Sequence, residues 1–122
     1  MNNILSISGL DFGYTKDAPL YRDFSLDLDR GQVKAIVGPS GAGKSTLFEL
    51  ILGNLKAQSG TIEVQNCAMV FQDPYSSFHP SYTVINQIKD VASLEGMESY
   101  LETMKLDAEL LEKLPHELSG GQ

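Results

Sequence analysis

The chain has 122 residues, of which 42% are hydrophobic and 20% charged, with a formal net charge of -7 at pH 7. This length and balance are typical of a soluble globular domain. An acidic chain has no basic face to displace the counterions of a nucleic acid, so we predict no nucleic-acid partner. Cys67 is the only cysteine, which excludes an internal disulfide and fits a cytosolic protein. No apolar run reaches the roughly 18 residues that cross a bilayer, so work at a membrane would need another subunit.

The first part of the chain predicts strands around a single helix. Alternation or β-branched composition predicts strands at residues 4–10, 24–29, 33–37, 61–64 and 68–71. The first two alternate and the third is apolar apart from Lys34, which suggests a small antiparallel sheet beside a buried strand. We place Ala18–Leu20 in a loop and predict a helix over Leu47–Leu52 that ends near Gly53. Gln65 and Asn66 predict a tight connection between the last two strands.

The second part of the chain begins with a loop over residues 72–82, rich in proline and serine and carrying aromatic side chains. Three short amphipathic helices are predicted after it, over residues 84–92, 97–104 and 107–114. We expect Thr83 and Asp107 to cap the first and the third of them, and Pro115 to stop the third. The chain therefore divides into a predicted core over residues 1–82 and a predicted helical subdomain over residues 83–122.

One stretch between the third predicted strand and the first helix indicates a specific chemistry. It fits Gly-x-x-x-x-Gly-Lys-[Ser/Thr] and comprises Gly38, Pro39, Ser40, Gly41, Ala42, Gly43, Lys44, Ser45 and Thr46. Glycines let the backbone curl so that successive N–H groups point at phosphate oxygens, and the helix start adds partial positive charge. Lys44 supplies a cation for the β- and γ-phosphates, and Ser45 a hydroxyl for Mg²⁺. The alternative is a glycine-rich turn before an ordinary helix, but the flanking strand and helix favour a phosphate loop.

A second specific sequence, Leu118-Ser119-Gly120-Gly121-Gln122, lies at the other end of the chain. Alone it would predict the start of a serine-capped helix. After a phosphate loop, a loop glutamine at Gln72 and a helical segment, in that order, it makes the whole chain resemble the first part of an ATP-binding-cassette (ABC) ATPase. The resemblance implies an α/β fold: a three-layer phosphate-loop NTPase with an antiparallel β flank and a helical insert, without its C-terminal part.

The resemblance also implies roles for individual residues. Tyr14 matches the aromatic that stacks on adenine, although its residue type alone would favour a core or turn tyrosine. Gln72 matches the loop residue that approaches Mg²⁺ and the attacking water, with a plain polar loop residue as the alternative. Lys44 and Gln72 would thus support catalysis, and Ser45 and Gln72 would approach the metal. The residues matching the motif that contacts nucleotide held by the other subunit are Ser119, Gly120, Gly121 and Gln122.

Within this family, residues 71–80 and 114–117 resemble the importer branch for oligopeptides, dipeptides and nickel. The resemblance implies ATP and Mg²⁺ as cofactors and a second ATP-binding-cassette subunit, in a homodimer or heterodimer. It also implies transmembrane permease subunits that dock near Gln72, and a peripheral location at the cytoplasmic face of the plasma membrane. His79 and His116 lie far apart in sequence, and no carboxylate–histidine spacing supports a metal site at either.

The match stops at Gln122, before the positions of the family's Walker B aspartate, catalytic glutamate and switch histidine. Two functions therefore stay open: part of a hydrolysing importer ATPase, or a truncated module that binds ATP or a partner cassette without turnover. A third, a phosphate-loop kinase, fits less well because the only arginines, Arg22 and Arg30, precede the loop. A sheet lacking neighbours would leave a pairing edge, so we also expect marginal stability or self-association.

Overall fold

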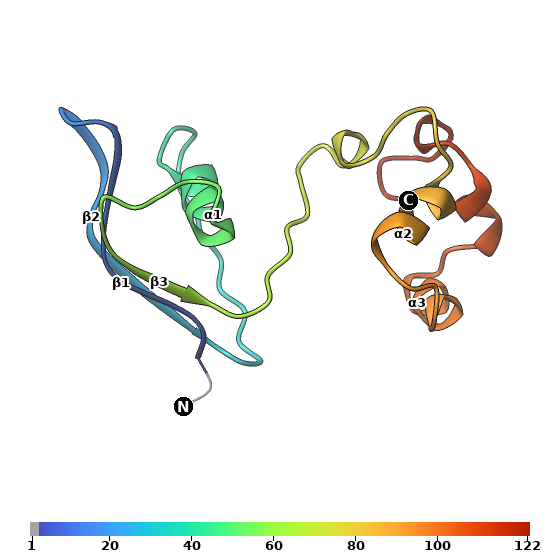
Figure 1. The fold of residues 1–122 in the computed structure, drawn as a ribbon, viewed down its shortest axis with the longest axis horizontal. Helices are drawn as coiled ribbons and strands as arrows, with labels where there is room; N and C mark the ends of the chain where they lie inside the picture. Colours follow the sequence, from blue (N-terminus) through green and yellow to red (C-terminus); the bar gives the residue numbers. More distant parts are fainter. Residues whose placement is uncertain (1–2) are drawn as a thin grey trace. The chain divides into compact units, whose positions relative to one another are not determined.

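The computed structural model describes residues 3–122 and forms two compact units, one ending at Ala68 and one running from Met69 to Gln122 (Figure 1). This structural division falls earlier in the chain than the boundary predicted between residues 82 and 83. The functional division at that position stays a prediction. Each unit is described below by itself.

A three-stranded antiparallel sheet forms one side of the first unit, in the order β2-β1-β3. The strands are β1 (Asn3–Thr15), β2 (Ala18–Asp29) and β3 (Ser59–Val64). The predicted strands at 4–10, 24–29 and 61–64 are therefore present, and all three are longer than predicted. Ala18–Leu20 lie in β2, so their placement in a loop was wrong. The hairpin continues because Gly13 lets the strands approach: an added Cβ there would lie 2.8 Å from the Ala18 carbonyl oxygen.

Helix α1 (Lys44–Leu52) packs against one face of this sheet (Figure 1). Leu47 and Leu50, one helical turn apart, bury their side chains there. Their partners on β1 are Leu5, Ile7, Leu10 and Phe12. Alternation places each of the two pairs on one face, and the irregularity between Ile7 and Leu10, where Gly9 has a φ of 60°, keeps both pairs in the same core. The helix begins earlier than the predicted Leu47 and ends, as predicted, at Gly53, whose φ of 84° suits a glycine cap. This core fixes the first turn of α1 relative to the hairpin.

The predicted strands at residues 33–37 and 68–71 are not formed, and this is the main correction to the predicted fold. Val33 is 97% exposed and Val70 is 95% exposed. A strand needs a neighbour to accept its backbone hydrogen bonds, and within residues 3–122 neither segment pairs with another strand. Ile36 alone of the first segment packs against the core. Because residues 68–71 are not a strand, Gln65 and Asn66 do not join a hairpin.

The second unit contains short helices rather than a sheet. Helices α2 (Val84–Val91) and α3 (Met97–Met104) confirm two predicted helices, and 3₁₀ turns cover Pro74–Ser77, Ala108–Glu112 and Pro115–Glu117. The predicted third helix is thus only a 3₁₀ turn. Leu114, which precedes Pro115, is extended at φ −76° and ψ 152°, as a residue before proline prefers. Neither Thr83 nor Asp107 makes the predicted side-chain cap.

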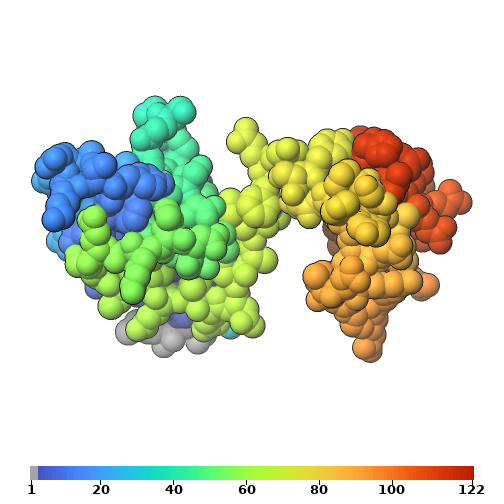
Figure 2. All heavy atoms as spheres, turned by 45° about the horizontal axis from the view of Figure 1, so that its top comes forward, coloured from blue at the N-terminus to red at the C-terminus, as the bar shows by residue number. Residues whose placement is uncertain are grey.

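Residues 69–82 lie along the C-terminal segment within this unit. The Tyr75 hydroxyl donates a hydrogen bond to the Leu118 carbonyl at 2.8 Å, and in Figure 2 the yellow atoms of this region contact the red atoms near the C-terminus. Val84, Leu101 and Pro115 are the buried residues of its helices and turns. Over residues 3–122, none of the helices has both the length and the apolar character needed to cross a bilayer.

Candidate nucleotide-binding site

The phosphate loop is curled, as its glycines require. Gly41 and Gly43 have φ values of 83° and 100°, a region that residues with a Cβ avoid. Between them, the Ala42 N–H donates to the Pro39 carbonyl at 3.1 Å and closes a turn. Gly43 is also closely packed, because an added Cβ would lie 3.0 Å from Cγ of Leu20. The nine-residue stretch is therefore curled, as an anion-binding loop requires, rather than extended.

The N-terminus of α1 points its amides at this loop. The Gly43 carbonyl accepts the first helical hydrogen bond, from the Leu47 N–H at 3.0 Å. The amides of Lys44, Ser45 and Thr46 come before that bond in the helix and so lack an intrahelical acceptor. Together with the helix dipole, they favour an anion in front of the helix.

Lys44 supplies the positive charge of the loop. Its ammonium group donates hydrogen bonds to the carbonyls of Gly38 and Pro39, the latter at 2.9 Å. These are neutral acceptors on an exposed surface, and a phosphate oxygen is a stronger acceptor for an ammonium. A lysine stem is flexible enough to exchange the two carbonyls for phosphate without moving the backbone.

Tyr14 joins this site from the end of β1. Its hydroxyl lies 2.8 Å from Oγ1 of Thr46, a residue that is only 9% exposed. Its ring is 67% exposed and meets the ring of Phe12 edge to face, with 5.1 Å between centroids. Tyr14 is therefore not a core tyrosine. Most of the residue is open to solvent, while its hydroxyl is held on the helix that carries the phosphate loop. Stacking of the ring on adenine stays a prediction.

Two further residues support the loop and were not found from the sequence. The Tyr21 hydroxyl donates to the Gly43 carbonyl at 2.7 Å, and Leu20 lies against Gly43. Burial raises the pKa of Tyr21 above its ordinary value, which already lies well above neutral pH, and the protonated hydroxyl can therefore donate. The signal that could have found Leu20 and Tyr21 is the length of the second strand. A strand predicted from Ala18 would have placed Tyr21 opposite Phe12 in the sheet.

These groups fit a magnesium–nucleotide complex. Amides, an ammonium and a helix N-terminus form a donor set for phosphate oxygens, and the Ser45 hydroxyl adds one oxygen ligand of the kind Mg²⁺ takes. Mg²⁺ usually completes its shell from water and phosphates, so one protein ligand is compatible with it. Gln72, the other predicted metal-approaching residue, belongs to the second unit, and its pairing with Ser45 stays a prediction.

The predicted signature residues form a compact turn in the second unit. The Gln122 N–H donates to the Ser119 carbonyl at 3.1 Å and to the Ser119 hydroxyl at 3.3 Å. In return, the Gln122 side chain accepts from the Ser119 N–H at 2.9 Å. This reciprocal pair is the hydrogen-bond pattern of a capping box at a helix start. A Cβ added at Gly120 or at Gly121 would meet no other group within 4 Å, so there is open space beside the backbone at both glycines.

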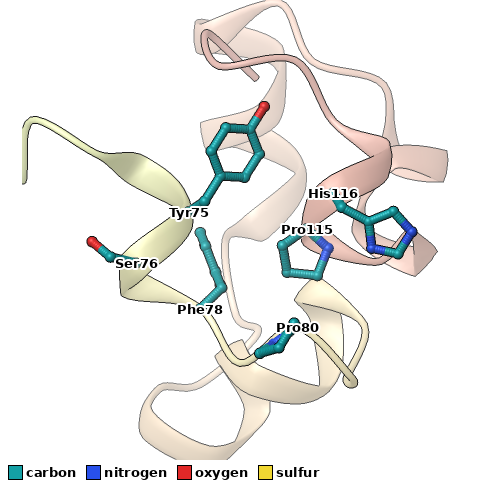
Figure 3. Close-up of a pocket in the computed structure, with 6 residues that line it drawn as sticks. All are labelled: Tyr75, Ser76, Phe78, Pro80, Pro115 and His116. Atoms are coloured by element: carbon teal, nitrogen blue, oxygen red, sulfur yellow. The ribbon is translucent and has the colours of Figure 1, made fainter.

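The loop that follows Gln72 lies against this turn. A pocket of about 240 Å³ is lined by Pro74, Tyr75 and Phe78 together with the residues of the turn from Leu118 to Gln122. A neighbouring groove of about 500 Å³ has walls from the two sides, Tyr75, Phe78 and Pro80 on one and Pro115 and His116 on the other (Figure 3). Within the second unit, the predicted Gln72 loop and the predicted signature are thus adjacent.

Comparison with known proteins gives one consistent family. The sequence profile of the family described as "ABC transporter" matches residues 21–122. The nickel import system ATP-binding protein NikE of Staphylococcus aureus strain MSSA476 is 34% identical over 98% of this chain, and NikE of strain USA300 matches equally well. The chain spans 57% of the length of these relatives.

Solved structures of similar fold agree with this. The chain superposes with a TM-score of 0.76 and 27% identity on cbiO1 of Clostridium perfringens, described as part of the ABC transporter complex cbiONQ, covering 58% of that chain. A putative metal-chelate type ABC transporter gives a TM-score of 0.68 at 26% identity, with 52% of that chain covered. The likeness confirms the predicted α/β fold of phosphate-loop ABC ATPases with an antiparallel β flank.

Proposed function

Since this chain belongs to the ABC transporter family, we propose that it binds Mg-ATP as part of the ATP-binding subunit of an importer. One observation carries the proposal. In a single compact unit, the curled phosphate loop, the Lys44 ammonium and the exposed Tyr14 ring gather at the N-terminus of α1. These are the groups needed for the charged and the planar ends of a nucleoside triphosphate.

The residues divide the nucleotide between them. The Tyr14 ring stacks on the adenine, and the amides of residues 43–46 receive the phosphates at the helix start. Lys44 leaves the Gly38 and Pro39 carbonyls for the β- and γ-phosphates. Ser45 directs its hydroxyl to Mg²⁺, which neutralises phosphate charge when bound. Binding needs only these groups.

Hydrolysis and transport need a second set of residues. We propose that Gln72 positions the attacking water and the metal, and that Ser119 to Gln122 contact the nucleotide of a second ATP-binding-cassette subunit. The open backbone at Gly120 and Gly121 supports such a contact with phosphate. The aromatic and proline groove beside the Gln72 loop supports docking of a permease subunit there. The subunit would then work at the cytoplasmic face of the membrane.

We propose nickel or a peptide as the transported solute. The support is the similarity to proteins named as nickel import ATP-binding subunits, together with the importer-like run over residues 71–80. The solute would be recognised by other subunits, because the groups gathered at the phosphate loop suit a nucleotide. The alternative is a module that binds ATP without turnover. Such a module would release no inorganic phosphate, whereas a hydrolysing subunit would.

A binding titration with a parallel phosphate-release assay tests the proposal. Mg-ATP is titrated into the purified chain, into Lys44→Ala, and into Lys56→Ala, which removes an exposed lysine of the same unit as a control. Loss of a charge-assisted contact predicts about 10- to 100-fold weaker binding for Lys44→Ala and no change for Lys56→Ala. A folded wild-type chain that binds no Mg-ATP, or equal affinity in Lys44→Ala, would overturn the proposal. Release of inorganic phosphate by the wild-type chain would favour a hydrolysing ATPase subunit, and binding without release would favour a module that only binds ATP.

A further inference from the structure

We propose that Tyr21 is a positioning residue that keeps the Lys44 N–H aimed at the bound phosphates by holding the Gly43 carbonyl on the opposite side of the same peptide. The inference rests on the proposed nucleotide site. It does not require Tyr21 to touch the nucleotide.

The geometry of one peptide unit carries the argument. The Gly43 carbonyl receives two donors, the Tyr21 hydroxyl at 2.7 Å and the Leu47 N–H at 3.0 Å. The chain has no cis peptide bonds in its described part, so the Gly43 carbonyl and the Lys44 N–H point in opposite directions across a planar unit. Both lone pairs of the carbonyl are therefore engaged on the helix side, and the Lys44 N–H is turned toward the mouth of the loop.

Glycine makes this restraint necessary. Gly43 has a φ of 100°, and a glycine moves between backbone regions more freely than any other residue. Rotation of the Gly43–Lys44 peptide would point its carbonyl, a negative dipole end, at the phosphates in place of an N–H. The Leu47 bond opposes that rotation, but it is a single bond to the last carbonyl before the helix. A second donor from outside the helix holds the peptide independently of that turn.

Tyr21 is itself well fixed for this task. Its ring packs on Phe24 with centroids 5.0 Å apart, and its backbone lies opposite Phe12 in the sheet register. Leu20, the preceding residue, contacts Gly43 directly and prevents the loop from shifting toward the strand. The hydroxyl that reaches the loop is thus attached to the hydrophobic core of the first unit.

The test compares two ligands that share only their phosphates. Mg-ATP and magnesium tripolyphosphate are titrated into the wild-type chain and into Tyr21→Phe, Tyr14→Ala and Tyr100→Phe, the last an exposed tyrosine of α3 as control. For Tyr21→Phe we expect both ligands to weaken by the same factor, about 3- to 10-fold, the effect of one hydrogen bond. Tyr14→Ala, which also removes the hydroxyl that contacts Thr46, should weaken ATP by a larger factor than tripolyphosphate, and Tyr100→Phe should weaken neither ligand.

A second measurement follows the peptide itself. In the wild-type chain the Lys44 amide should show a large nitrogen and proton shift when tripolyphosphate binds, and in Tyr21→Phe that shift should be reduced at equal saturation. In the free wild-type chain, the Tyr21 hydroxyl proton should exchange with water more slowly than that of Tyr100, which tests the bond even if Tyr21→Phe does not fold.

Two results would overturn the inference. One is unchanged affinity of Tyr21→Phe for both ligands, and the other is a Tyr21 hydroxyl that exchanges as fast as that of Tyr100. A wild-type chain that is folded but binds neither ligand would instead refute the proposed function, so the two failures are distinguishable.

Discussion

Replacement of Tyr14 by phenylalanine and by alanine separates the two tasks of that side chain. Tyr14→Phe keeps the ring and its edge-to-face contact with Phe12 but removes the hydroxyl bound to Thr46 at 2.8 Å. Tyr14→Ala removes both. If the exposed ring stacks on adenine and the hydroxyl fixes the ring for that purpose, the two variants should lose affinity for Mg-ATP in two distinct steps.

The magnitudes follow from the contacts. A stacked base contributes about 1–3 kcal/mol by alanine substitution, so Tyr14→Ala should weaken ATP by about 5- to 150-fold. Tyr14→Phe leaves the Thr46 hydroxyl, on a residue only 9% exposed, without its partner, at a cost of about 1–2 kcal/mol. We expect this cost to lower the urea midpoint for unfolding of the free chain. The affinity for Mg-ATP should fall by no more than about fivefold.

The assay is a double-mutant cycle with Thr46→Val, read by urea denaturation and by titration with Mg-ATP. In the Thr46→Val background, Tyr14→Phe should no longer lower the midpoint, because the hydroxyl then has no partner to lose. Equal destabilisation by Tyr14→Phe in both backgrounds would refute the tether. Unchanged ATP affinity in Tyr14→Ala, with the fold intact, would refute the stacking role.

Two further predictions concern the scaffold of the site. Leu47→Ala should lower the free energy of unfolding by about 3 kcal/mol, because Leu47 is 1% exposed in the core. Phe48→Ala, at a 42% exposed position of the same helix, should lower it much less. Equal losses of the two variants in urea denaturation would contradict this packing. The Ser59 hydroxyl and a backbone amide lower the pKa of Asp11, so its stabilising effect is full above the ordinary carboxylate pKa and is lost as the pH falls through the lowered value. Asp11→Asn should therefore lose less stability than wild type between pH 7 and pH 3, and an unchanged acid profile of the urea midpoint would contradict that.

The parts of the site that the sequence predicts well are those whose geometry is local. Gly41 and Gly43 must adopt positive φ for the loop to curl, and the helix that follows supplies amides wherever it begins. The turn from Ser119 to Gln122 is likewise closed by its own two side chains. Such motifs can be predicted from the sequence because the residues that interact in them lie within a few positions of one another.

The strands at residues 33–37 and 68–71 could not be judged in the same way. Their apolar composition indicates that they would be buried as strands. It does not indicate whether a neighbouring strand is present to pair with them. In the structure Val33 and Val70 are almost fully exposed, so the pattern predicted a requirement rather than a formed element. The local pattern of apolar residues does not predict which distant segments will pair in a sheet.

Tyr21 shows a third limit, and it bears on how the site works. Its role depends on a contact 22 positions along the chain, between a strand residue and a loop carbonyl, which no spacing rule links. Tyr14 makes the same kind of connection over 32 positions. Because both hydroxyls come from the β1–β2 hairpin, the first turn of α1 is held by that hairpin as well as by its own core contacts. The geometry of the phosphate loop therefore does not depend on a strand at residues 33–37. A chain in which that segment stays unpaired should still present the amides of residues 43–46 to a triphosphate.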